Sequence, residues 1–209
     1  QLVNARNVGK AYYIIPGPAE KAVDHRTQLQ HEYLHFLLDP LIDKFKPIIL
    51  KHEKLLDLAQ NQPHIRPEFQ NQYMMVVGES LIESLVLKLN PTRDLNRSLV
   101  GLFRDGLIFA PYFFKALGPY EADVTLTMPV YVETLCTGVG EKAIRAEEAW
   151  VAELEKRYDQ EQAAKLAATR QEQQRMLRHS YLRNLLVQAQ ELMRQEKYSE
   201  ASAKLEELL

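Results

Sequence analysis

The sequence predicts a mainly α-helical protein with one small β element, followed by a long helix and a C-terminal helical hairpin. Apolar residues recur at helical spacing over most of the chain, and only residues 11–16 (AYYIIP) have the aromatic and β-branched composition of a strand. After residue 140 the composition becomes charged and rich in alanine. We therefore expect two parts, residues 1–138 and residues 139–209, divided near the glycines of the sequence GVG.

In the first part, a helix is predicted over residues 20–39, capped by Asp24 or Thr27 and ended by Pro40. A second helix over 41–59 should kink or break at Pro47, because proline cannot continue the helical hydrogen bonds. Residues 68–89 form the most apolar predicted helix of the chain, and we expect it to be buried.

The remaining segments follow the same spacing. We expect a helix over 95–117 with a bend at Pro111, whereas residues 124–135 fit either a strand or the start of a helix. A long, mostly exposed helix is predicted from residue 141 to about 179. The last 29 residues predict two helices with a break near Glu196 and Lys197.

Composition excludes several classes of function. Hydrophobic residues make up 46% and charged residues 26% of the 209 residues, and the formal net charge of -2 predicts no nucleic-acid partner. The longest apolar run, at 107–114, is too short for a membrane span. Cys136 is the single cysteine, so any metal must be bound by histidine and carboxylate. The compartment is left open.

One motif carries chemistry. Residues 28–39 read QLQHEYLHFLLD, in which His31, Glu32 and His35 have the spacing H-E-x-x-H. Residues four apart lie on one face of a helix, so both imidazoles can bind a single ion, for which Zn2+ is the expected metal. Alternatively, the two histidines are structural and are satisfied by polar partners. Zinc lowers the pKa of a bound water toward neutrality, and Glu32 beside it can take the proton as general base.

A pair of glutamates is the second candidate feature. Glu79 and Glu83 lie one turn apart within the apolar helix, in GESLIES. Carboxylates in an apolar helix are costly unless a positive or hydrogen-bonding group meets them, and a zinc ion with two histidines would do so. Alternatively, both lie on a polar stripe of a half-exposed helix. His52 and Glu53 are a second source of ligands, but flanking lysines favour a solvated face.

These residues resemble the active-site region of zincin metallopeptidases, over about the first 90 residues. The six residues after His35 contain neither the glycine nor the third histidine of the metzincin branch. The gluzincin branch, typified by thermolysin, instead takes its third ligand from a glutamate on a later helix, commonly followed four residues on by an aspartate. The resemblance thus implies Glu79 as ligand and Glu83 as the partner that orients a histidine. The reverse assignment stays open, because Glu83 stands in place of the aspartate.

The resemblance also implies further parts of a peptidase site. A donor to the oxyanion is needed downstream, and the candidates are Tyr112, Tyr120, Tyr131 and His179, with Tyr131 favoured because it follows the glutamate helix in an irregular segment. The strand at 11–16 stands where gluzincins place the edge strand that pairs with an extended substrate. An ordinary edge strand explains it equally well.

The C-terminal residues Ala189, Tyr198, Ala201 and Leu205 have the spacing of small and aromatic positions in a tetratricopeptide unit, which the hairpin resembles. Since a single unit is visible, a plain helical hairpin is the alternative. We therefore expect a zinc metallopeptidase acting on a peptide or protein. The competing expectation is an inactive zincin-like scaffold that binds a protein partner through its C-terminal hairpin.

Overall fold

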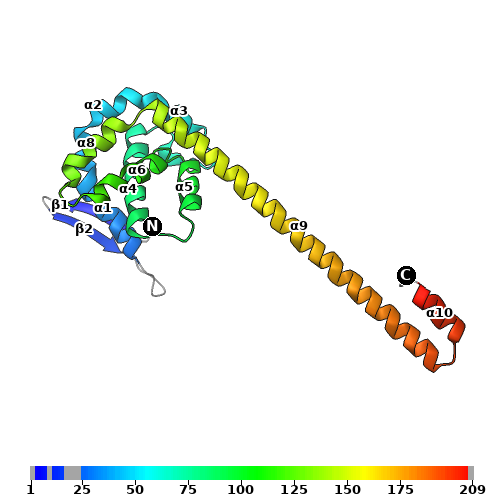
Figure 1. Ribbon diagram of the computed structural model, residues 1–209. Helices are drawn as coiled ribbons and strands as arrows, with labels where there is room; N and C mark the ends of the chain where they lie inside the picture. Colours follow the sequence, from blue (N-terminus) through cyan, green and yellow to red (C-terminus); the bar gives the residue numbers. More distant parts are fainter. Residues whose placement is uncertain (1–2, 9–10, 17–24, 207–209) are drawn as a thin grey trace. The chain divides into compact units, whose positions relative to one another are not determined.

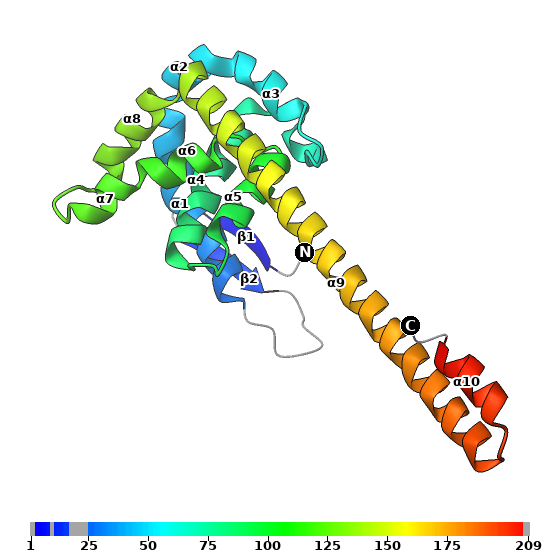
Figure 2. The same ribbon diagram turned by 45° about the vertical axis from the view of Figure 1, so that its right-hand side comes forward.

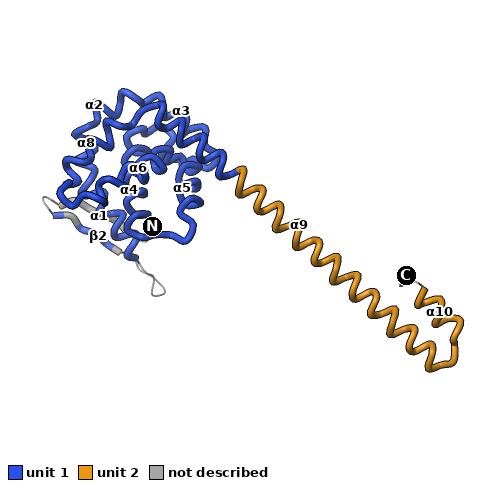
Figure 3. Tube along the Cα trace, viewed as in Figure 1, with its two compact units in different colours: residues 1–155 blue, residues 156–209 orange. Residues whose placement is uncertain are grey.

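The computed structural model describes residues 3–8, 11–16 and 25–206, and the described part is mainly helical, as predicted (Figure 1). The chain divides into two compact units, Gln1–Glu155 and Lys156–Leu209 (Figure 3). No described helix combines the length and the apolar composition that crossing a bilayer requires.

The β element is an antiparallel hairpin. Strand β1 (Val3–Val8) pairs with β2 (Ala11–Pro16) in the register that joins Val3 to Pro16 and Val8 to Ala11. The sequence predicted β2 but missed β1, because the polar sequence VNARNV lacks the apolar alternation of a half-buried strand. The main-chain N–H and C=O groups of β1 are satisfied by hydrogen bonds to β2, which does not require apolar side chains. Both strands contact α1.

Helix α1 (Arg26–Lys44) carries the H-E-x-x-H motif and continues through Pro40, where the sequence predicted its end. Proline in a helix removes one hydrogen bond, yet Leu38 and Ile42 on either side of it are 2% and 4% exposed. Burial of these two side chains holds the helix together across the proline. Of the two predicted caps, Asp24 lies outside the described residues and Thr27 lies inside the helix, while His25 at the start of the helix makes no side-chain cap.

The predicted break near Pro47 is present. The chain leaves α1 at Phe45 and continues as α2 (Lys46–Ile49), the 3-10 helix η1 (Leu50–Leu55) and α3 (Leu56–Gln60). Pro47 lies in the first turn of α2, where its missing N–H costs nothing. A loop and the short η2 (Pro67–Phe69) lead into α4 (Tyr73–Leu89).

Helix α4 is the centre of the first unit and packs against both α1 and α6 (Figures 1 and 2). The Ser84 hydroxyl donates to the carbonyl of Ser80 at 2.6 Å and lies 2.9 Å from that of Ala110, which ties α4 to α6. This core fixes the position of the glutamate face of α4 relative to α1.

The predicted helix at 95–117 is two helices, α5 (Leu95–Arg104) and α6 (Ala110–Ala116). The break falls at Gly106, whose positive φ of 98° suits glycine, and Pro111 occupies the first turn of α6 rather than a bend. Next comes α7 (Gly118–Ala122), and the ambiguous segment forms α8 (Met128–Gly138). The side chains of Phe103, Phe109 and Phe113 are fully buried.

Helix α9 (Glu141–Arg194) runs without interruption through the two segments predicted as separate helices. The helix begins three residues after the boundary predicted at residue 138, whereas the first compact unit extends to Glu155, and Ile144, Val151 and Leu154 of α9 are buried. The expected break occurs at Glu196, which has a φ of 60°, and α10 (Tyr198–Glu206) follows. In this hairpin Ala189 and Ala201 are buried, while Tyr198 is 65% exposed.

Candidate metal centre

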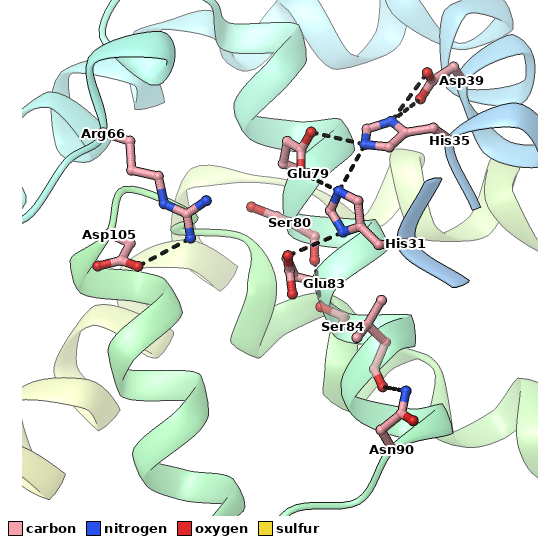
Figure 4. Close-up of polar contacts among 11 residues, drawn as sticks. His31, His35, Asp39, Arg66, Glu79, Ser80, Glu83, Ser84, Asn90 and Asp105 are labelled. Carbon is pink, nitrogen blue, oxygen red and sulfur yellow. Dashed lines mark hydrogen bonds and ion pairs between the residues drawn. The ribbon is translucent and has the colours of Figure 1, made fainter. Parts of the chain in front are cut away.

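Two packed helices bring the sequence-predicted ligands together. His31 and His35, one turn apart on α1, face Glu79 and Glu83, one turn apart on α4 (Figure 4). The side chains of these four residues are between 19% and 24% exposed. The glutamates therefore line the contact between two helices, rather than a fully buried core or a solvated stripe.

Three side chains converge on one point. The Nε2 atoms of His31 and His35 lie 3.1 Å apart. The Glu79 carboxylate lies 3.1 Å from Nε2 of His35 and 3.6 Å from Nε2 of His31. Two ligand nitrogens ~2.05 Å from a tetrahedral zinc ion are separated by about 3.3 Å. The three ligand groups thus have the mutual spacing that a tetrahedral ion requires, and their ligand atoms lie within 4.8 Å of one another.

Each imidazole has a carboxylate on its other nitrogen. Nδ1 of His31 is 3.3 Å from Glu83, and Nδ1 of His35 is 3.2 Å from Asp39. A carboxylate at Nδ1 keeps the hydrogen on that nitrogen and leaves the Nε2 lone pair free, as in metal sites where an outer carboxylate orients each ligand histidine. This is the arrangement expected if Glu79 is the ligand and Glu83 the orienting partner, an assignment that stays a prediction.

The electrostatics of the group favour a shared cation. Burial alone would lower the pKa of His35, but its hydrogen bonds with Asp39 and Glu79 outweigh burial and raise the pKa to about 10. Burial would also lower the pKa of His31, but Glu83 and Glu79 outweigh burial and raise it. Burial would raise the pKa of Glu79, yet the two histidines lower it. Positive charge is therefore stabilised at the point where the Nε2 atoms meet, whether a proton or a metal ion supplies it.

Glu32 lies on α1 next to His31 and is half-buried. It takes part in an interaction within the chain. Its role as general base stays a prediction from the motif.

The structure does not bring the favoured oxyanion donor into the group. The Tyr131 hydroxyl donates to the carbonyl of Ala116 at 2.6 Å, and its ring stacks on Tyr120. Tyr112 points its hydroxyl toward the carbonyl of Leu135. These contacts account for the two tyrosines as packing residues, and no described contact links Tyr131 to the histidines. His179 lies on α9 in the other compact unit.

Two residues near the ligands were missed as functional candidates. Asp39 was not expected in the site, although its i,i+4 spacing from His35 predicts the side-chain pair that the structure has. Arg66, in the loop before η2, pairs with Asp105 at 3.3 Å, and its charge helps to lower the pKa of Glu79 (Figure 4). Because it comes from a loop with no motif, local sequence gave no signal for it.

The alternative ligand source, His52 and Glu53, lies on η1 and is not part of the group. No known family, curated protein or solved structure matches this chain.

Proposed function

We propose that the protein is a zinc-dependent metallopeptidase of gluzincin type, in which His31, His35 and Glu79 bind the metal. The observation that carries the proposal is the convergence of two Nε2 atoms and one carboxylate, each histidine being oriented by a further carboxylate. One proton between the two Nε2 atoms, which lie 3.1 Å apart, would satisfy the same pair without a metal, so zinc binding is the property that separates the metal centre from a structural histidine pair.

Different residues of the chain would have separate roles in hydrolysis. When bound, zinc would supply Lewis-acid activation of a water and of the scissile carbonyl. Glu32 would take a proton from the attacking water as the water oxygen adds to the carbonyl carbon, and would return the proton to the amide nitrogen as the C–N bond breaks. Glu83 and Asp39 accept hydrogen bonds from Nδ1 of His31 and His35, which favours the tautomer with a free lone pair on Nε2 for the metal.

The hairpin gives a place for an extended peptide. In the described part of the chain the sheet has two strands, so β2 has an edge that no other described strand covers. A peptide added there would be held by main-chain hydrogen bonds, and α1, which β2 contacts, carries the H-E-x-x-H residues.

Metal analysis combined with a Glu32→Gln variant tests the proposal. Purified protein should bind about one zinc per chain and cleave members of a peptide library. Glu32→Gln should retain the metal and lose cleavage, since the amide cannot take a proton. Absence of zinc binding would refute the peptidase proposal.

A second candidate function is a scaffold that binds a protein partner through the C-terminal hairpin. The observation in its favour is the exposure of large apolar side chains on the second unit, including Leu177 at 70%, Val187 at 57% and Tyr198 at 65%. Zinc bound stoichiometrically without cleavage of any peptide would favour this candidate.

A further inference from the structure

A pocket of about 260 Å³ borders the candidate centre and shares His35 and Glu79 with it. It lies between α1 and α4. The other lining residues are two aspartates, three apolar side chains and a glycine: Asp39, Asp43, Ile42, Met74, Met75 and Gly78. Because it shares two residues with the centre, the pocket is close enough to take a side chain next to a bond held at the centre.

The size of the pocket suits a single long side chain. Sites for whole small molecules are usually about 300–1,000 Å³, whereas 260 Å³ is the volume of roughly nine liquid waters at ~30 Å³ each. Ile42 is 4% exposed and Gly78 is buried, so these two form the inner end. Asp39 and Asp43 are exposed and form the rim.

Gly78 is needed for space in the pocket rather than for packing of the helices. It lies inside α4, where glycine is less favourable than alanine by up to ~1 kcal/mol. A Cβ at this position would meet Ile42 at 3.8 Å, an ordinary contact that the core would accept. The absent methyl group instead leaves the inner end of the pocket open.

The charge of the pocket is negative. Its ionisable lining residues are His35 and three carboxylates, and no lysine or arginine lines it among the described residues. Glu79 and Asp39 are engaged by the histidines. Asp43, by contrast, has no side-chain partner in the part of the chain that the structure describes, so its carboxylate at the rim is available to a ligand.

We propose that this pocket selects substrates with a lysine or arginine side chain next to the scissile bond, an inference that rests on the proposed peptidase function. The apolar stem lies along Ile42, Met74 and Met75, and the cationic end reaches Asp43 at the rim. Long cationic side chains bury their methylenes and keep the charge near water in this way.

The test uses binding as well as cleavage. Zinc-loaded Glu32→Gln protein, which should bind peptides without turnover, is titrated by calorimetry with peptides that carry lysine, norleucine or glutamate at one scanned position. Norleucine keeps the stem and removes the charge. At one position lysine should bind about fivefold more tightly than norleucine, the effect of a partly exposed ion pair.

Two further variants assign the effect to Asp43. Asp43→Asn in the same background should abolish the preference for lysine over norleucine, and Asp43→Lys should favour glutamate. Asp57→Asn removes the same charge from an exposed position on α3 and should leave the preference intact. No lysine preference at any position, or a preference unchanged in Asp43→Asn, overturns the proposal.

The experiments distinguish failure of the proposed lysine or arginine selectivity from failure of the proposed peptidase function. Cleavage by the wild-type protein without any preference for a basic residue overturns the pocket and leaves the peptidase standing. Asp43-dependent binding of lysine peptides without cleavage overturns the peptidase and retains the pocket as a binding site. Neither binding nor cleavage overturns both.

Discussion

Replacing each glutamate of α4 by glutamine should separate the metal ligand from its orienting partner. Glu79 lies against the Nε2 atoms of both histidines, whereas Glu83 contacts Nδ1 of His31 on the far side of the ring. Loss of an orienting carboxylate typically weakens metal binding by 10–100-fold. We therefore expect Glu83→Gln to lose affinity within that range, and Glu79→Gln to lose more than 100-fold.

Thermal unfolding converts these losses into measurable shifts. At a zinc concentration 100 times the wild-type Kd, binding stabilises the folded state by about 2.7 kcal/mol. For a unit of 155 residues this raises Tm by roughly 5–10 °C. A tenfold weaker Glu83→Gln retains about 1.4 kcal/mol of that stabilisation, and a variant weakened more than 100-fold retains less than about 0.4 kcal/mol.

The assay is differential scanning calorimetry of both variants and the wild type, with zinc and with excess chelator. The chelated samples serve as the control, because they report any effect of glutamine on the fold itself. A larger zinc-dependent shift for Glu79→Gln than for Glu83→Gln would refute the assignment and exchange the two roles. Equal shifts in all three proteins would place the metal elsewhere.

Three other predictions follow from the packing. Gly78→Ala should raise the free energy of unfolding by about 0.5–1 kcal/mol, because alanine favours the helix and its Cβ would lie 3.8 Å from Ile42, an ordinary contact. A lower Tm of the variant would show that the core has no room for the methyl group. Cys136 is 1% exposed, and burial raises the pKa of its thiol to about 11. Iodoacetamide at pH 8 should therefore label Cys136 only after unfolding, as measured by mass spectrometry. Rapid labelling of the folded protein would contradict this prediction. The bidentate contact of Arg104 with Glu155 should give a coupling energy of about 1 kcal/mol in a double-mutant cycle measured by urea unfolding. If the effects of the two alanine substitutions on the free energy of unfolding simply add, the pair contributes nothing.

Local spacing predicted those parts of the protein that depend on neighbours along the chain. The helical period, the chain break near Pro47 and the turn at Glu196 follow from hydrogen-bond loss at proline and from the interruption of an apolar pattern. The same period placed His31 and His35 on one face of α1, since residues four apart on a helix are spatial neighbours.

Tertiary packing decided what local spacing could not. Helix α1 passes through Pro40 because burial of Leu38 and Ile42 outweighs one lost hydrogen bond, and β1 forms because β2 supplies its partners. The prediction of Tyr131 as an oxyanion donor needed a contact with the ligand group, whereas its hydroxyl donates to the carbonyl of Ala116.

The candidate centre depends both on spacing along the sequence and on packing between helices. The sequence determined that two histidines and two glutamates occur in pairs at helical spacing, but spacing within each helix says nothing about the distance between helices. Packing of α1 against α4 brought Glu79 to the Nε2 atoms and Glu83 to Nδ1 of His31. The order of the two glutamates in the site depends on how one helix is rotated and shifted against the other, and only the tertiary structure fixes that.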